Sequence, residues 1–564
     1  MKMKKLLALG LAMIMAFSLV GCSSSSSDDT DDEEEVEEEA EDEEEEEADD
    51  DEDSEGTKIF RYSVTTEPTS LDQQKGNSIG DNELIHAMQE GLVRTKDGEV
   101  CAGIAESWEV SDDGLTYTFY LREAYWSDGV QITAGDFVYG LQRLLDPETA
   151  SPYAYIGEYI LNGAAVEAGE MEVEELGVEA TDDLTLVITL ESPTAYFLEL
   201  IGTCAQYTAC REDYVEEYGV EFAASAEKNV YSGPFCLVST DGGEYVFEKN
   251  EYYWDAEDVN FDQVVVSVVA DENTALSLYE SGELDYVKVP TASVSLYEDE
   301  AEYYMNGNED YLYINHESDN TVLANLNFRL ALNYAIDREE YIELATDGVY
   351  TAWNCIVMPL VSGVNGTYGD EYTLTSYPLA GDSDAAVAYL EAALEEEGIS
   401  SASDITIEFT TTDSETNKVI AEVIQEMWTN VLGINVEIRQ VTYSEIYGTV
   451  FPDGDYEVGY GGWAPDYSDP YTYLELFKSD SPYNYSNYSN EEVDALLEAS
   501  QTETDAQTRM DMLNEAEQLL LDDAANVPLQ LRTQYYLLDD DVTGIIFDFT
   551  AINIDWSFGD CDPT

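Results

Sequence analysis

Residues 28–55 contain 23 Asp or Glu residues in 28 positions and no Lys or Arg. Adjacent carboxylates repel one another, and this stretch has too few apolar residues to drive collapse. It cannot belong to a packed domain, so we expect residues 22–57 to form an extended, disordered tether. Calcium binding by the acidic run is a weak alternative, because clustered acids without fixed geometry are poor ligands. The folded body is therefore expected to begin at Lys58.

The first 22 residues have the features of an export signal followed by a lipid-attachment site. Three lysines among the first five residues form a basic region, and Leu6–Val20 is an apolar run too short for a comfortable membrane span. Leu19-Val20-Gly21-Cys22 resembles a bacterial lipobox. This predicts a signal peptide over residues 1–21 and lipidation of Cys22, which would hold the protein at the outer face of the cytoplasmic membrane in a Gram-positive-type envelope. The alternative is an ordinary secretory peptide that happens to contain a cysteine.

The charge and the histidine content exclude several classes of function. The net charge is −102, and residues 58–564 alone hold 100 acids and 18 bases. Nucleic acid is excluded as a partner, because a polyanion would be repelled. His86 and His316 are the only histidines, so His-rich metal sites and most Ser–His–Asp schemes lack their residues. We expect no metal site and no cofactor.

Six cysteines remain after Cys22. In an exported protein they permit disulfides, but six cysteines allow fifteen pairings and the sequence does not choose among them. Free buried thiols are an equal alternative. The six are Cys101, Cys204, Cys210, Cys236, Cys355 and Cys561.

From Lys58 onward, alternating and helical-period segments interleave, which predicts α/β lobes with mixed sheets. The predicted strands are Thr116–Leu121, Leu184–Leu190 and Tyr245–Phe247. The predicted helical segments are Ala134–Leu145, Ala385–Glu397, Asn417–Leu432 and Glu491–Leu521. Gly129 should take a positive φ in a reverse turn after Trp126, and Pro147 should end the helix near Leu145.

Nine short motifs, in order along residues 59–555, resemble those of the extracellular solute-binding proteins of family 5 that feed peptides to ABC importers. The nearest likeness is to the oligopeptide-binding lipoproteins. The motifs are Glu67-Pro-Thr-Ser-Leu-Asp72, Ala105-Glu-Ser-Trp108, Leu115-Thr-Tyr-Thr-Phe-Tyr-Leu-Arg122, Trp126-Ser-Asp-Gly129 with Thr133-Ala-Gly-Asp-Phe-Val138, Asp146-Pro-Glu-Thr-Ala-Ser-Pro-Tyr153, Ser281-Gly-Glu-Leu-Asp285, Ala335-Ile-Asp-Arg338 and Gly462-Trp-Ala-Pro-Asp-Tyr-Ser-Asp-Pro470.

The resemblance implies a periplasmic-binding-protein-like type II clamp, with two lobes, an extra third domain and mixed sheets, that closes on its ligand by hinge motion. Lobe I is expected to comprise residues 58–80, 211–313 and 534–564. The extra domain, residues 81–210, would be inserted in lobe I, and lobe II would span residues 314–533. The resemblance further implies a monomeric binding protein rather than an enzyme, with oligopeptides as ligands and the permease subunits of an ABC importer as partners.

Peptides of different sequence share a backbone and an α-ammonium, so a tolerant binder must hold those common parts. The match to the family motif implies that Asp466 holds the α-ammonium. Tyr460, Gly461, Gly462 and Trp463 match the segment that pairs with an extended ligand as an added strand. The alternatives are a solvated surface acid at Asp466 and a glycine-kinked core strand before it.

Further positions are implied by the resemblance alone. Glu67, Pro68 and Thr69 match the opposite lip of the cleft, where Pro68 has no N–H to donate. Tyr153 matches a tyrosine near the first residues of the ligand, and Tyr443, like Trp463, matches an aromatic position at a side-chain pocket. As core aromatics both would be equally ordinary.

Arg532 lies where some relatives place a tyrosine, and it permits three interpretations. It can pair with Asp466, with a ligand carboxylate, or with any neighbouring acid. Asn417 lies where a relative has a group that reaches the ligand C-terminus, which implies indirect carboxylate recognition or a different length preference here.

Two other functions remain open from the sequence. The same scaffold can be tuned for a dipeptide, a signalling peptide, a nickel complex or an oligosaccharide. An extracellular hydrolase is a remote alternative: paired acids are uninformative among 123 carboxylates, and no Gly-x-Ser-x-Gly nucleophile motif stands out.

Overall fold

The structure is a computed structural model that describes residues 56–96, 99–550 and 552–563. The predicted signal peptide, the lipidation site at Cys22 and nearly all of the acidic tether lie outside the described residues. Within the described ranges, no helix combines the length and the apolar character needed to cross a membrane.

The first sheet is four-stranded and mixed, with the order β1-β10-β9-β8. Its strands are β1 (Ile59–Val64), β8 (Phe235–Ser239), β9 (Glu244–Lys249) and β10 (Gln263–Val268). β1 runs parallel to β10 and the other pairs are antiparallel. Alternate residues of β1, Phe60 and Tyr62, are buried in one core with Leu84 and Ile85 of α1 (Ile79–Met88). The predicted strand at Tyr245–Phe247 is confirmed as part of β9.

The second sheet is antiparallel, with the order β4-β5-β7-β6. Its strands are β4 (Ala105–Val110), β5 (Thr116–Leu121), β6 (Val178–Asp182) and β7 (Thr185–Thr189). α2 (Ala134–Leu145) contributes Phe137 and Leu141 to the same core as β5. The predicted β5, β7 and α2 are confirmed. Gly129 has φ +80°, and its N–H donates to the Trp126 carbonyl at 2.8 Å, as the turn prediction requires.

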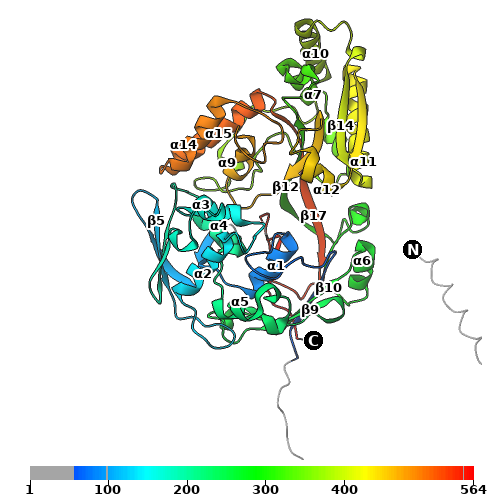
Figure 1. Ribbon diagram of the computed structural model, residues 1–564. Helices are drawn as coiled ribbons and strands as arrows, with labels where there is room; N and C mark the ends of the chain where they lie inside the picture. Colours follow the sequence, from blue (N-terminus) through cyan, green and yellow to red (C-terminus); the bar gives the residue numbers. More distant parts are fainter. Residues whose placement is uncertain (1–55, 97–98, 551, 564) are drawn as a thin grey trace, which may run out of the picture. The chain divides into compact units, whose positions relative to one another are not determined.

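The third sheet has seven strands and two unusually long members. In order they are β11 (Tyr286–Lys288), β17 (Asn526–Leu538), β12 (Glu302–Ile314), β16 (Val458–Trp463), β14 (Thr406–Thr412) and β15 (Asn435–Val441), with β13 (Thr351–Ala352) pairing to β17. Figure 1 shows β17 running from the neighbourhood of β9 and β10 up to that of β14. The expected chain crossings after residues 313 and 533 fall inside β12 and β17.

Helices cover the third sheet. Four of them share a core with its strands: α7 (Leu326–Tyr334), α8 (Arg338–Ala345), α10 (Ser383–Glu397) and α11 (Glu415–Leu432). The predictions for α10 and α11 are confirmed. A single helix over Glu491–Leu521 is wrong, because α14 (Glu491–Thr502) and α15 (Ala506–Asp522) are separate. Asp505 caps α15 by accepting from the Thr508 N–H at 2.9 Å, so the chain stops and restarts there.

The remaining elements are short. They are β2 (Val93–Lys96), β3 (Glu99–Ala102), α3 (Gly163–Glu167), α4 (Phe197–Thr203), α5 (Glu212–Tyr218), α6 (Glu272–Glu280), α9 (Tyr368–Glu371), α12 (Tyr443–Glu445), α13 (Tyr471–Leu474), β18 (Ile546–Phe547) and β19 (Ile554–Asp555).

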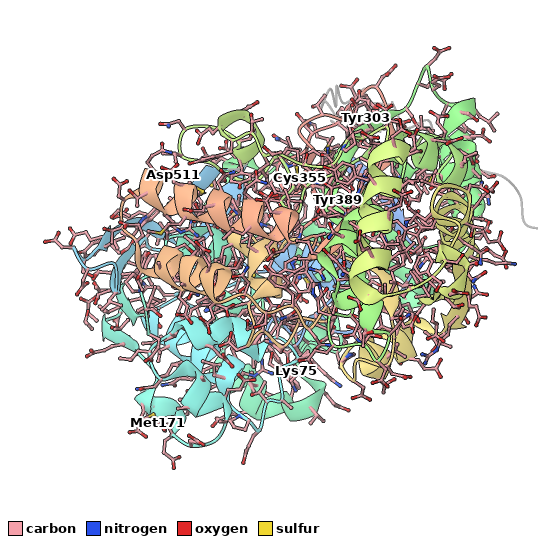
Figure 2. The ribbon with its side chains drawn as sticks, turned by 90° about the horizontal axis from the view of Figure 1, so that it is seen from above. Lys75, Met171, Tyr303, Cys355, Tyr389 and Asp511 are labelled. Atoms are coloured by element: carbon pink, nitrogen blue, oxygen red, sulfur yellow. The ribbon has the colours of Figure 1, made fainter. Side chains whose placement is uncertain are left out.

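The cysteines and the surface agree with a reduced, highly charged protein. All six cysteines of the described ranges are free thiols. No group of three or more His, Cys, Asp or Glu side chains in the described ranges has the arrangement of a metal site. Figure 2 shows oxygen-tipped side chains covering the periphery, with Asp511 on the outside of α15.

Candidate functional site

One edge of β16 is free over its second half. All six residues of β16 pair with β12, from Val458↔Ile314 to Trp463↔Glu309. On its other side, β16 pairs with β14 only at Val458 and Gly459. From Tyr460 to Trp463 this side has no strand partner among the described residues. Such an edge offers backbone N–H and C=O groups to an extended ligand.

The two glycines of β16 are explained by packing inside the sheet. A Cβ atom on Gly462 would lie 2.2 Å from the carbonyl oxygen of Glu309 and 2.7 Å from Oδ1 of Asp310. A Cβ atom on Gly461 would lie 2.6 Å from the ring of Tyr313. The close approach of β12 therefore requires both glycines, in line with the core-strand alternative, and approach of a ligand is not needed to account for them.

Asp466 follows β16 after a short Ala-Pro turn and is partly buried. Its Oδ1 accepts a hydrogen bond from the Tyr153 hydroxyl at 3.4 Å, and its own N–H donates to Oγ1 of Thr472 at 3.4 Å. Burial raises the pKa of Asp466 to about 6, although the hydroxyls of Tyr153 and Tyr155 act in the opposite direction. No Lys, Arg or His of the described residues forms an ion pair with this carboxylate.

Aromatic rings surround this carboxylate and connect two distant parts of the chain. The ring of Tyr153 lies 5.2 Å from that of Tyr155, which lies 6.2 Å from Tyr483. Tyr483 in turn contacts Trp463, with 5.3 Å between ring centres. The indole Nε1 of Trp463 is buried and has no hydrogen-bond partner among the described residues. A buried donor of this kind is suited to an acceptor on a ligand.

A second carboxyl group is hydrogen-bonded to Tyr467, the residue that follows Asp466. The hydroxyl of Tyr467 donates to Oε1 of Glu475 at 3.2 Å. Burial is the largest cause that raises the pKa of Glu475 to about 8, and the charge of Asp466 is the second. The sequence analysis missed Glu475, Tyr155 and Tyr483. Among 123 acids and 42 tyrosines, the only signal for Glu475 was its position a few residues after the Asp466 motif.

The other residues of β16 and β17 named from the sequence serve the sheet. The Tyr460 side chain is buried, and its hydroxyl accepts from Nε2 of Gln530 at 3.3 Å. Arg532 binds both oxygens of Asp310, with Nε–Oδ2 at 2.8 Å and Nη2–Oδ1 at 2.9 Å. Pairing of Arg532 with Asp466 is therefore wrong, because its guanidinium is already held by the adjacent strand.

Two further candidates lie on helices away from Asp466. Asn417 lies in the first turn of α11, and its Nδ2 donates to Oγ1 of Thr412 at 2.7 Å. Tyr443 is 72% exposed and packs on Tyr447, with 4.9 Å between ring centres. An exposed aromatic side chain of this kind is available to an incoming ligand.

The expected opposite lip is occupied by local contacts. Glu67 and Thr69 are exposed. The N–H and the hydroxyl of Thr69 donate to the two carboxylate oxygens of Asp81, at 2.7 and 2.6 Å. Because Pro68 also lacks a donor, this lip offers few free N–H groups. In the described part of the chain, no hydrogen bond or ion pair joins it to Asp466.

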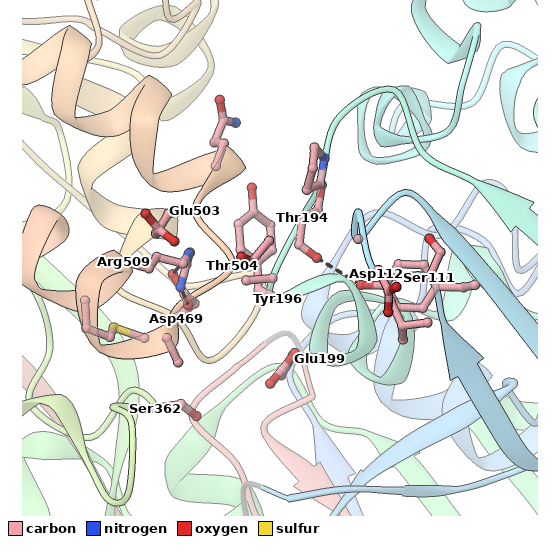
Figure 3. Close-up of a pocket in the computed structure, with 18 of the residues that line it drawn as sticks. Ser111, Asp112, Thr194, Tyr196, Glu199, Ser362, Asp469, Glu503, Thr504 and Arg509 are labelled. Atoms are coloured by element: carbon pink, nitrogen blue, oxygen red, sulfur yellow. Dashed lines mark hydrogen bonds and ion pairs between the residues drawn. The ribbon is translucent and has the colours of Figure 1, made fainter.

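A pocket of about 380 Å³ lies near these residues but does not include Asp466. Figure 3 shows Ser111 and Asp112 on one side of it, and Arg509, Asp469 and Glu503 on the other. Its wall contains Tyr196, whose ring stacks on Tyr467 at 4.4 Å and 2°. The guanidinium of Arg509 lies 5.4 Å from the Tyr196 ring and is paired with Asp469. Stacking of Tyr196 on Tyr467 thus joins the segment before α4 to the segment that carries Asp466.

Comparisons with known proteins identify the family and the fold of the chain. The profile of bacterial extracellular solute-binding proteins, family 5 Middle, matches residues 99–485. The chain is 32% identical over 512 residues to the oligopeptide-binding protein OppA of Bacillus subtilis (strain 168), covering 88% of this chain and 92% of that protein. It is 29% identical over 553 residues to the dipeptide-binding protein DppE of the same organism, covering 97% of each. The solved structure of Listeria monocytogenes OppA bound to peptide has a TM-score of 0.72 and 30% identity, covering 90% of this chain and 99% of that one.

Proposed function

The chain belongs to family 5 of the bacterial extracellular solute-binding proteins, and on this basis we propose that it binds oligopeptides by their backbone and α-ammonium and delivers them to an ABC import permease. Its fold is the type II clamp expected from the sequence, and it is a solute-binding protein, not an enzyme. The single observation that carries the proposal is that the Asp466 carboxylate is desolvated and forms no ion pair within the described residues.

Asp466 is a desolvated carboxylate that forms no ion pair with any cation of the described residues. Burial of an unpaired charge is costly, and this cost is reflected in the raised pKa of Asp466. An ammonium group beside Oδ1 would supply the missing charge, while the Tyr153 hydroxyl remains as a second donor. Asp466 thus suits the α-ammonium of a peptide, which is present whatever the peptide's sequence.

The free edge of β16 supports recognition of the peptide backbone. A peptide whose ammonium lies at Asp466 would reach this edge directly, because only two residues separate Trp463, the last residue of β16, from Asp466. Residues from Tyr460 to Trp463 would then pair with the peptide as an added strand. Main-chain pairing tolerates many side chains, which is the property a general peptide receptor requires.

The remaining candidates take secondary roles in this proposal. Tyr153 orients Asp466, and the exposed ring of Tyr443 offers an apolar contact for a ligand side chain. The Nη1 of Arg532 has no hydrogen-bond partner among the described residues and would be available to a ligand carboxylate. Asn417 and the main chain of the lip at 67–69 would contribute through polar contacts at the margins.

We propose that the chain is divided into two lobes and an extra domain. Lobe I comprises residues 58–80, 211–313 and 534–564, the extra domain comprises 81–210, and lobe II comprises 314–533. The three larger sheets, which are separate from one another, support this division, as do the long strands β12 and β17 at the crossing points. The lipobox-like sequence at Cys22 supports a membrane anchor that keeps the monomeric receptor beside its permease. We expect Cys22→Ala to move the protein from the membrane fraction to the culture medium.

The test is direct identification of the ligand. The purified protein is denatured and released peptides are identified by mass spectrometry; free-amine peptides are then compared with their N-acetylated forms by thermal shift. A peptide at 100 times its dissociation constant should add about 2.7 kcal/mol of stability. We expect this for free amines and not for acetylated forms. The absence of stabilisation by every free-amine peptide would contradict the proposal.

A further inference from the structure

Glu475 begins a short 3₁₀ turn after α13, close to the proposed ammonium site. It is partly exposed, and Tyr467, the residue next to Asp466, donates to its carboxylate at 3.2 Å. The ring of Tyr483 contacts those of Trp463 and Tyr155, at 5.3 and 6.2 Å between ring centres, and burial, followed by the charges of Tyr485, Asp466 and Glu475, raises the pKa of Tyr483. The site therefore holds two carboxyl groups rather than one.

The cations nearest to these acids are engaged elsewhere. Lys478 pairs with Asp480 at 3.1 Å and with Glu498 at 3.7 Å. Arg509 holds both oxygens of Asp469, at 2.6 and 2.9 Å. Within the described residues, neither Asp466 nor Glu475 has an ion pair. Two neighbouring carboxyl groups without a cation are unfavourable unless one stays protonated or a ligand supplies the charge.

Two observations independent of the acids indicate a ligand here. The edge of β16 leading to this point has no strand partner among the described residues. The buried Nε1 of Trp463 has no acceptor in the described part of the chain, and the Trp463 ring lies beside that of Tyr483. A peptide paired to this edge would run toward the Asp466–Tyr467 segment, whose Tyr467 hydroxyl donates to Glu475.

We propose that Glu475 acts with Asp466 to select peptides whose first residue carries a second positive charge, such as lysine, ornithine or arginine. The α-ammonium binds Asp466 and the side-chain cation binds Glu475. The partly exposed ring of Tyr483 provides apolar surface for the methylene groups of that side chain. This inference rests on the proposed function, because it takes the position of the α-ammonium from it.

The net charge of −102 would attract any cationic peptide, wherever its charge lies. The inference is instead positional: the charge on the first residue counts, and the charge on the second does not. The first experiment therefore uses the parent protein alone, with calorimetric titration of Lys-Ala-Ala, Ala-Lys-Ala and norleucine-Ala-Ala at pH 7.5 in 0.5 M NaCl.

We expect Lys-Ala-Ala to bind at least tenfold more tightly than both other peptides. Equal affinity of Lys-Ala-Ala and Ala-Lys-Ala, or of Lys-Ala-Ala and norleucine-Ala-Ala, would overturn the inference. Binding of norleucine-Ala-Ala, abolished by its N-acetylation, would at the same time uphold the proposed function. Failure of all three peptides to bind would instead contradict the proposed function together with the inference. The two cases are therefore distinguished by whether norleucine-Ala-Ala binds.

The second experiment assigns the effect to one residue. Glu475→Gln keeps the shape of the side chain and should bring the Lys/norleucine affinity ratio close to one, leaving the affinity for norleucine-Ala-Ala within twofold. Glu492→Gln makes the same charge change on the exposed start of α14 and should leave the ratio unchanged. If Glu475→Gln leaves the Lys/norleucine affinity ratio unchanged, or if Glu492→Gln lowers that ratio as much as Glu475→Gln does, the role of Glu475 is contradicted.

Discussion

The guanidinium of Arg532 in β17 grips the carboxylate of Asp310 in β12 through two hydrogen bonds of 2.8 and 2.9 Å. The Asp310 side chain is only 2% exposed, whereas that of Arg532 is 39% exposed. Gln530 adds a third hydrogen bond to Oδ2 of Asp310 at 2.6 Å. The pair therefore neutralises a buried acid where the two long strands meet, and it leaves one face of the guanidinium open.

Removing Arg532 should destabilise the fold. In Arg532→Ala the buried carboxylate of Asp310 loses its counter-ion, and we expect the free energy of unfolding to fall by about 2 kcal/mol. Urea unfolding followed by circular dichroism measures this. Arg439→Ala is the matched control, because Arg439 pairs with the more exposed Glu408 and Asp455 and should cost less than about 1 kcal/mol. Equal losses in the two variants would contradict the assignment.

Gly462→Ala tests whether the glycine serves packing. The added Cβ would meet the Glu309 carbonyl oxygen at 2.2 Å, so strand β12 must move, at a cost of at least about 2 kcal/mol. Gly448→Ala is the control, because a Cβ there meets nothing within 4 Å. Thermal unfolding distinguishes the two. A Gly462→Ala protein with parental stability that fails to bind peptide would show instead that the glycine serves the ligand.

Local patterns predicted the elements well where one face of an element is buried. Ala134–Leu145 has a helical apolar period and a Thr133/Asp136 capping box, and it is α2 as expected. The break between α14 and α15 was missed, because apolar periodicity continues across it and the only local signal was the cap at Asp505.

The site was predictable only in part. The motif around Trp463 drew attention to Asp466, but the residues that surround it come from segments far apart in the chain, such as Tyr155 and Tyr483. Which of so many acids and tyrosines meet is decided by tertiary packing, not by local pattern. The same holds for Arg532, whose partner Asp310 lies 222 residues away in sequence.

Stability should decrease as the pH rises from about 6.5 to 8. Burial is the main cause that raises the pKa of three glutamates from the usual 4.5. The pKa of Glu83 and of Glu517 rises to about 7, and that of Glu475 to about 8. Between pH 4.5 and these raised values the unfolded chain has released the protons and the folded chain still holds them, so a rising pH favours unfolding until each folded pKa is passed. His86 and His316 oppose this only up to about their unfolded pKa of 6.5, because burial lowers their folded pKa to about 3 and 4 and above 6.5 both are neutral in either state.

Calorimetric melting at pH 6.5, 7.5 and 8.5 measures this dependence. Repeating it in 1 M NaCl separates buried groups from surface repulsion, because salt screens only the latter. We expect a falling melting temperature at both salt concentrations. A constant or rising melting temperature in 1 M salt would contradict the assignment.

Glu309→Gln should stabilise the protein at high pH. The Glu309 side chain is fully buried, both carboxyl oxygens lack a hydrogen-bond partner among the described residues, and burial holds its pKa well above the usual range. An amide keeps the shape and cannot ionise, so we expect about 1–3 kcal/mol of added stability at pH 8.5 and less at pH 5. Glu437→Gln, on the exposed side of β15, should change neither value. A lower free energy of unfolding for Glu309→Gln than for the parent at pH 8.5 would contradict this prediction.

The central claim is that Asp466 binds the α-ammonium of the ligand, and one titration series tests it most directly. The affinity of a free-amine peptide and of its N-acetylated form is measured by calorimetry at pH 7.5 for the parent and for Asp466→Asn. We expect the parent to prefer the free amine at least 30-fold, consistent with about 2 kcal/mol for a desolvated charge pair, and the variant to lose that preference while keeping its melting temperature. If Asp466→Asn binds the free-amine peptide as tightly as the parent does and still discriminates against the acetylated form, the account is contradicted.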